Sequence, residues 1–98
     1  MTAWFMYVVE TATGSFYCGI TKDVNRRIET HNRGRGAKYL RGSRLPVRLL
    51  TTWHFDQETA HSDALKAECW FKRQSKINKI NIVHYQERHG NRWRPKIP

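Results

Sequence analysis

The chain has 98 residues, which is about the size of one domain and leaves no room for a second folding unit. Its hydrophobic fraction of 39% and aromatic fraction of 12% exclude an intrinsically disordered protein. Because 18 Lys and Arg stand against 8 Asp and Glu, the net charge is +10. This charge favours a polyanionic partner, with nucleic acid ahead of an acidic membrane surface.

Sequence signals for several protein classes are absent. No run of 18 apolar residues occurs, so we expect no membrane-spanning helix. The N-terminal residues lack the basic and then apolar segments of a secretory signal. Cys18 and Cys69 are too few for a disulfide framework, and the common zinc motifs are missing. We therefore expect a protein of the cytoplasm, or of the nucleus, that is neither secreted nor bound to a membrane.

The first third of the chain predicts a β-hairpin followed by a helix. Residues 4–10 (WFMYVVE) and 15–20 (SFYCGI) are typical of strands, and the turn residues 11–14 between them favour antiparallel pairing. Asp23 is a good N-cap for a helix with Val24, Ile28 and His31 on one face, and Gly34 is placed to end it. Residues 47–55 predict a third strand.

Two further helices are predicted after the third strand. Asp56 can cap a helix over residues 57–74, and Ser75 can cap another over residues 76–83. The order β-β-α-β-α-α predicts an α+β fold, a small three-stranded antiparallel sheet flanked by helices. We expect one domain over residues 1–85 and a basic C-terminal tail over residues 86–98, which contains Arg92, Trp93, Arg94 and Lys96.

The connection between the first helix and the third strand is strongly basic. From Thr30 to Phe55 there is no Asp or Glu. Glycines in this loop let a backbone approach phosphate closely, and an aromatic side chain can stack on an unpaired base. We expect a grip on a nucleic-acid backbone, with a solvated flexible loop as the alternative. The residues expected to bind nucleic acid are Arg33, Arg35, Lys38, Tyr39, Arg41 and Arg44, and Arg48 adds a further charge.

One carboxylate lies on an apolar helix face. Glu68 follows Ala64 by four residues and precedes Phe71 by three, so it shares the face of the second predicted helix that these residues form. A buried unpaired carboxylate costs several kcal/mol, so Glu68 must meet a cation, a metal ion or water. A salt bridge to a neighbouring Lys or Arg is the alternative to a metal site.

Four more polar residues form two pairs whose chemistry could serve a functional site. Arg27 and His31 are neighbours on one helix, where an Arg can bind a phosphate and a His can relay a proton. A surface Arg and a helix-terminal His are the ordinary alternative. Tyr7 and Tyr17 should lie close to opposite each other in the hairpin, and such a pair can also stabilise a sheet without any chemistry.

Taken together, these residues resemble the GIY-YIG nuclease family. The first family motif corresponds to Phe5-Met6-Tyr7 and the second to Tyr17-Cys18-Gly19, although the family's Gly and Ile are replaced at positions 5, 6 and 18. The segment DVNRRI (23–28) with His31 is similar to the family's arginine helix, and ALKAE (64–68) to its metal-binding helix. The loop over residues 34–42 resembles that of small stand-alone members from bacteria and DNA viruses. A late family asparagine corresponds to Asn78 or Asn81.

The resemblance implies a metal-dependent endonuclease that hydrolyses phosphodiester bonds in DNA, with branched, flapped or damaged DNA of repair and recombination as its substrate class. Glu68 would hold one divalent ion, Mg²⁺ or Mn²⁺. Arg27 would contact the scissile phosphate beside His31. Tyr7 would be the general base and Tyr17 would orient water or phosphate, with the exchange of these two roles as the alternative. A base role requires the phenol pKa of about 10 to be lowered. Gly19 would let the backbone turn beside the site.

Two other functions fit the same sequence. A catalytically silent nucleic-acid-binding module of the same fold would bind in a salt-dependent way without cutting. A basic protein that docks on acidic partners would need none of these residues to cluster. In each case a targeting partner protein, a homodimer, the basic loop or the tail would select the target.

Overall fold

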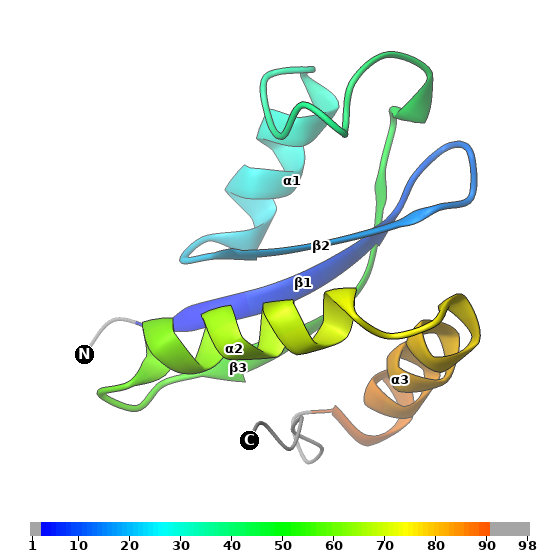
Figure 1. Ribbon diagram of the computed structural model, residues 1–98. Helices are drawn as coiled ribbons and strands as arrows, with labels where there is room; N and C mark the ends of the chain where they lie inside the picture. The colour runs from blue at the N-terminus through cyan, green and yellow to red at the C-terminus, as the bar shows by residue number, and fades with distance from the viewer. Residues whose placement is uncertain (1–2, 91–98) are drawn as a thin grey trace.

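The computed structural model describes residues 3–90. Its strands are β1 (Trp4–Glu10), β2 (Phe16–Thr21) and β3 (Arg48–Phe55), and its helices are α1 (Val24–Asn32), α2 (Ala60–Lys72) and α3 (Lys76–His89). A short 3-10 turn, η1 (Gly42–Arg44), lies in the basic loop. The strands form one antiparallel sheet in the order β2-β1-β3 (Figure 1). The predicted α+β class and element order are therefore confirmed.

The β1–β2 hairpin sets which residues share a face. Tyr7 pairs with Gly19, and Val9 pairs with Tyr17. The two tyrosines are therefore diagonal neighbours on one face. The prediction that they lie opposite each other is wrong. This register differs because the turn is centred closer to Thr13 than to Ala12, which moves the pairing along by two residues.

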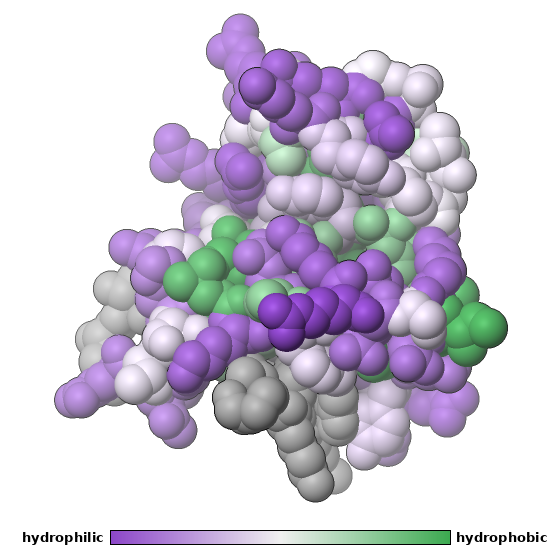
Figure 2. All heavy atoms as spheres, viewed as in Figure 1, coloured by the Kyte–Doolittle hydropathy of each residue, from purple (hydrophilic) through white to green (hydrophobic). Residues whose placement is uncertain are grey.

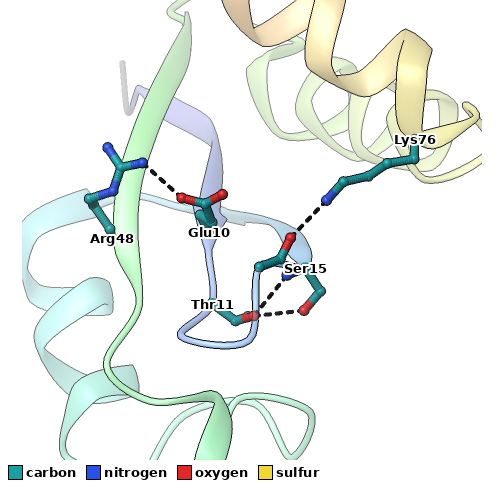
Figure 3. Close-up of polar contacts among 6 residues, drawn as sticks. Glu10, Thr11, Ser15, Arg48 and Lys76 are labelled. Atoms are coloured by element: carbon teal, nitrogen blue, oxygen red, sulfur yellow. Dashed lines mark hydrogen bonds and ion pairs between the residues drawn. The ribbon is translucent and has the colours of Figure 1, made fainter.

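Side chains from three parts of the chain fix the hairpin turn (Figure 3). Thr11 Oγ1 accepts a hydrogen bond from the Ser15 backbone N–H at 3.1 Å and lies 2.7 Å from Ser15 Oγ. The Lys76 ammonium donates to the Gly14 carbonyl at 3.0 Å, and Arg48 forms an ion pair with Glu10 at 2.8 Å. The turn is thereby joined to α3 and to the neighbouring strand.

The sheet carries a helix layer on each face, as Figure 1 shows, with α1 on one side and α2 and α3 on the other. Because strand side chains alternate, Met6, Val8 and Cys18 pack against α2, while Tyr7 and Val9 point the other way. The α2 side holds the larger core, which includes Trp53, Phe71 and Val83. We call the other side, covered by α1, the α1 face; its core consists of Tyr7, Val9, Leu40 and Val47.

The predicted helix starts at Asp23 and Ser75 are confirmed. The Asp23 side chain accepts from the Arg26 N–H at 3.1 Å, and the Ser75 side chain accepts from the Asn78 N–H at 3.2 Å. The prediction that Asp56 caps α2 is wrong, because α2 begins at Ala60 after Thr59. Thr59 Oγ1 donates to Asp63 Oδ2 at 2.8 Å.

The third helix is longer than predicted. It continues past Val83 to His89, because the buried side chains of Val83 and Gln86 hold its second half against the sheet. Gln86 Nε2 donates to the Thr52 carbonyl on β3 at 2.8 Å. The helix therefore includes the first residues of the expected tail, and the tail residues Arg92, Trp93, Arg94 and Lys96 lie outside the described part of the chain.

Within residues 3–90, no helix is long and apolar enough to cross a membrane. Figure 2 shows that hydrophilic residues dominate the visible face of the molecule, with only small hydrophobic areas between them.

Candidate active site

A buried tyrosine–histidine pair lies under α1. Tyr7 on β1 and His31 in the last turn of α1 are both fully buried, and Tyr7 Oη lies 2.7 Å from His31 Nε2. The backbone N–H of Ala37 donates to His31 Nδ1 at 3.3 Å. Because Nδ1 accepts this bond, the neutral ring carries its proton on Nε2 and donates it to the Tyr7 oxygen.

Burial sets the protonation states of this pair. Burial and the nearby Arg27 charge lower the pKa of His31 to about 4, so the imidazole is neutral at pH 7. Burial raises the pKa of Tyr7 to about 12, against the opposing hydrogen bond and charge of Arg27. The base role implied by the family resemblance requires a lowered phenol pKa. In the folded chain, burial outweighs Arg27 and the phenol stays protonated.

Two glycines make room for the pair. Gly19 faces Tyr7 across the hairpin, and a Cβ atom there would come within 2.5 Å of Tyr7 Oη. A Cβ atom on Gly36 would overlap His31 Nδ1. Gly19 lies inside β2, where it leaves room for the Tyr7 phenol. The backbone turn that was expected at Gly19 is not seen, because the residue continues the strand. Gly36, one of the glycines of the basic loop, packs on the His31 ring.

Arg27 and Tyr17 complete the group. Arg27, one turn before His31 on α1, is half-buried and hydrogen-bonds to Tyr7. The half-buried Tyr17 ring meets the His31 ring edge-on at a centroid distance of 5.7 Å, and its centroid lies 6.4 Å from that of Tyr7. We call Tyr7, Tyr17, Arg27 and His31 the α1-face cluster. A guanidinium and two phenols beside a neutral imidazole can bind and polarise a phosphate.

Glu68 approaches from the other side of the sheet. It lies on α2, and its charge adds to the effect of burial in raising the pKa of the Cys18 thiol on β2. Cys18 directly follows Tyr17 in β2, an edge strand of the sheet. Glu68 and the α1-face cluster therefore lie on either side of a single edge strand.

Among residues 3–90, Lys72 is the cation that forms an ion pair with the Glu68 carboxylate. Its Nζ lies 3.6 Å from Glu68 Oε2, and the side chains of Lys72 and Glu68 are 53% and 20% exposed. An ion pair with one half-exposed partner contributes little to stability. Lys72 is therefore a weak partner, and the Glu68 carboxylate can still bind another cation.

The donor set around Glu68 restricts which metal ion it suits. Among residues 3–90, no three His, Cys, Asp or Glu side chains come together to enclose an ion. One half-buried carboxylate fits a hard ion that keeps several waters, such as Mg²⁺ or Mn²⁺, and does not fit a structural zinc site. Asn78 and Asn81 are both exposed on α3.

The basic loop (residues 33–44) presents several cations. Arg33 pairs with Glu29, and Arg48 on β3 pairs with Glu10. Within the described part of the chain, the remaining loop cations have no acidic partner: Arg35, Lys38, Arg41 and Arg44.

Tyr39 joins the basic loop to the α1-face cluster. Its ring stacks on that of Tyr17 with a centroid distance of 6.2 Å, and the Arg44 guanidinium lies 4.2 Å from the Tyr39 centroid. Tyr39 Oη donates to Ser15 Oγ at 3.0 Å. Contacts with Ser15 and Arg44 lower the pKa of Tyr39.

Sequence reasoning missed two residues that shape this loop. Asn32 closes it, since its Oδ1 accepts from the Val47 N–H at 2.7 Å and its Nδ2 donates to the Val47 carbonyl at 3.3 Å. Ser15 links Tyr39 to the hairpin turn. Neither residue belongs to a local pattern, because both contacts depend on how distant segments fold together.

Comparison with known proteins supports one family. The GIY-YIG catalytic domain matches residues 3–81. A UPF0213 protein of Lacticaseibacillus paracasei is 46% identical over 91 residues, which cover 93% of this chain and 94% of that protein. A UPF0213 protein of Lactococcus lactis subsp. cremoris is 44% identical over 84 residues, covering 82% of each chain.

Solved structures show the same relationship. The solution structure of a UPF0213 protein from Bacillus halodurans is 37% identical, with a TM-score of 0.56 over 91% of this chain and 90% of that one. A protein from E. faecalis is 33% identical, with a TM-score of 0.59 over 96% and 97% of the two chains. By its matched domain, its relatives and its fold, this chain belongs to the GIY-YIG family, a family of nucleases.

Proposed function

We propose that this protein is a divalent-metal-dependent endonuclease that hydrolyses phosphodiester bonds in DNA. The observation that carries the proposal is the α1-face cluster: a buried Tyr7–His31 hydrogen bond with Arg27 and Tyr17 beside it, in a chain that matches the GIY-YIG catalytic domain. Such a cluster is not needed by a basic protein that merely docks on acidic partners.

Each residue of the cluster has a role that its contacts support. Arg27 binds the scissile phosphate and neutralises the charge that develops on it. Tyr17, which is half-buried and touches both other rings, orients the attacking water or a phosphate oxygen. The His31 Nε2–H and Arg27 both donate to the Tyr7 oxygen, and these two donors favour a phenolate there.

Tyr7 acts as the base only after it loses its proton. Its pKa of about 12 leaves a small phenolate fraction at neutral pH, and His31 cannot take the proton because its Nε2 already carries one. The rate of a base-catalysed reaction should therefore rise with pH through the alkaline range.

Glu68 is the residue that would hold the metal ion, Mg²⁺ or Mn²⁺. When bound, such an ion supplies positive charge that stabilises the transition state of phosphodiester hydrolysis. The basic loop grips the flanking backbone through Arg35, Lys38, Arg41 and Arg44, and its Arg33 and Tyr39 add to this contact. DNA is the expected nucleic acid.

A catalytically silent nucleic-acid-binding module is the second candidate. It is favoured by the high pKa of Tyr7, which keeps the proposed base protonated in the isolated protein. Branched, flapped or damaged DNA as the substrate, and a targeting partner or homodimer, stay predictions from the family resemblance.

The test is a cleavage assay on labelled duplex, single-stranded, flapped and branched DNA with Mg²⁺ or Mn²⁺. Wild type is compared with Glu68→Ala and with Glu87→Ala, a matched control that removes an exposed carboxylate from α3. We expect wild type and Glu87→Ala to cut, and Glu68→Ala to bind DNA without cutting it.

Two results would decide against the proposal. Cleavage by Glu68→Ala at the wild-type rate would remove the metal role of Glu68. Salt-dependent binding with no cleavage of any substrate under either metal would favour the silent module.

A further inference from the structure

A small cavity opens beside the α1-face cluster. Its volume is about 210 Å³, below the roughly 300–1,000 Å³ of pockets that hold drug-sized ligands. Aromatic rings form most of its wall, and two lysines contribute positive charge. The lining residues used below are Phe16, Tyr17, Tyr39, Phe71, Lys72 and Lys79.

This lining suits a flat, uncharged ring attached to a phosphate backbone. Lys76 Nζ lies 3.6 Å from the Phe16 ring centroid, and Lys79 Nζ lies 5.8 Å from that of Phe71, so each of these two wall residues has a cation beside it. Aromatic walls bind nucleobases by stacking, and the cations around them attract the neighbouring phosphates.

The cavity shares residues with both halves of the candidate site. Tyr17 belongs to its wall and to the α1-face cluster, and Lys72 belongs to its wall and pairs with Glu68. A phosphate bound between Arg27 and Glu68 would therefore place one of its flanking nucleosides next to this cavity.

Tyr39 is the wall residue best suited to be tested. Its hydroxyl is tied to Ser15, its ring leans on Tyr17, and it remains 42% exposed, so it is held in place yet accessible. It comes from the basic loop, which also carries the unpaired cations expected to hold the backbone.

We propose that this cavity binds one nucleobase of the nucleotide that flanks the scissile phosphate, with Tyr39 as a specificity-determining wall. The inference rests on the proposed nuclease function and adds a base subsite to it. A base inside a duplex cannot enter such a cavity, so the nucleotide at the cut must be unpaired or turned out of the stack.

The test uses oligonucleotides with one abasic residue and follows cleavage at every linkage separately under single-turnover conditions. Wild type should cut the linkage next to the abasic residue about tenfold more slowly than the same linkage next to a base, since stacking on one ring has an effect of that order. Tyr39→Ala should slow ordinary linkages by a similar factor, with no further loss beside the abasic residue. Tyr85→Ala, which removes a 47% exposed ring from α3, is the matched control and should cut like wild type.

Two outcomes would overturn the base subsite while leaving the nuclease intact. One is an abasic residue that slows no linkage. The other is a Tyr39→Ala loss that is equally large beside the abasic residue, which would mean that Tyr39 merely supports Tyr17.

A binding measurement keeps the test decisive if no DNA is cut, the result that would defeat the proposed function. An oligonucleotide carrying one 2-aminopurine should change fluorescence on binding wild type and Tyr85→Ala, and much less on binding Tyr39→Ala. The same change with all three proteins, or none with wild type, would contradict the base subsite.

Discussion

Gly19 and Gly36 contribute to the candidate site because they have no side chain. Tyr7 lies over Gly19 and His31 lies against Gly36, at distances that leave no room for a side chain. The GIY-YIG resemblance identified Gly19 from its motif. The reason that a glycine is needed there is the cross-strand pairing with Tyr7, which the motif does not show. Gly36 was recognisable only as one glycine of a basic loop, because its contact with the His31 ring depends on how the loop folds back over the end of α1.

A methyl group at position 19 should force Tyr7 away from His31. We expect Gly19→Ala to lower the free energy of unfolding by about 1–3 kcal/mol, the usual cost of overpacking a core, and to abolish cleavage. Urea denaturation and a cleavage assay measure the two effects.

The double variant Gly19→Ala/Tyr7→Leu provides the control. Because the Tyr7 hydroxyl and two of its ring carbons are the atoms closest to the added methyl, the stability cost of Gly19→Ala should shrink when the ring is already gone. An equal cost in both backgrounds would show that the glycine is needed for another reason.

The buried His31 should make the fold sensitive to acid. Its pKa is about 4 in the folded protein and about 6.5 when unfolded, so the unfolded chain binds the proton more readily. The stability from neutral His31 is complete above pH 6.5 and is lost as the pH falls toward 4. Between pH 7 and pH 5 we expect a loss of about 2 kcal/mol in urea denaturation.

A second histidine serves as the comparison for this pH effect. The loss should persist in His84→Gln, which changes an exposed residue of α3, and should largely disappear in His31→Gln. The same pH dependence in all three proteins would show that other groups cause it.

Local sequence signals predicted the starts of the helices better than their ends. Asp23 and Ser75 were recognised as caps because each precedes its helix directly. Asp56 looked equally suitable, but α2 starts four residues later, where its alanine stripe meets the sheet. The length of α3 was underestimated because Gln86, a polar residue in the sequence pattern, is buried against β3.

The basic loop should contribute to DNA binding through its unpaired cations. Lys38 is exposed and has no acidic partner within residues 3–90, whereas Arg48 is paired with Glu10. We expect Lys38→Gln to weaken binding and to reduce the slope of log affinity against log salt by about 0.7–0.9, the value for one phosphate contact. Fluorescence anisotropy over a salt series measures this slope.

Arg48→Gln removes the same charge from a residue that is already neutralised by its partner. Its salt slope should stay close to that of wild type. Equal slopes for Lys38→Gln and Arg48→Gln would mean that net charge alone, and not the loop, governs binding.

For the whole molecule, the sheet edge at β2 brings the parts of the site together. Tyr17 and Cys18 are consecutive, so they face opposite sides of β2, and Glu68 acts on Cys18 from the α2 side. Helical periodicity showed that Glu68 shares an apolar face, but left open whether a cation, a metal or water met it. The packing of α2 against β2 brings this carboxylate close to the α1-face cluster. Residue patterns could not predict that packing, so at the level of sequence only the family resemblance placed Glu68 and the cluster in one site.

A single active site that spans β2 requires Arg27 and Glu68 to act together. Single-turnover cleavage rates with Mn²⁺ are measured for wild type, Arg27→Lys, Glu68→Gln and the double variant. We expect each single change to slow cleavage by about 10²–10³-fold, and the double variant to be little slower than the slower single one, because residues that act as a unit are not additive. Losses that multiply in the double variant, or a Glu68→Gln rate equal to that of wild type, would contradict a single site spanning β2.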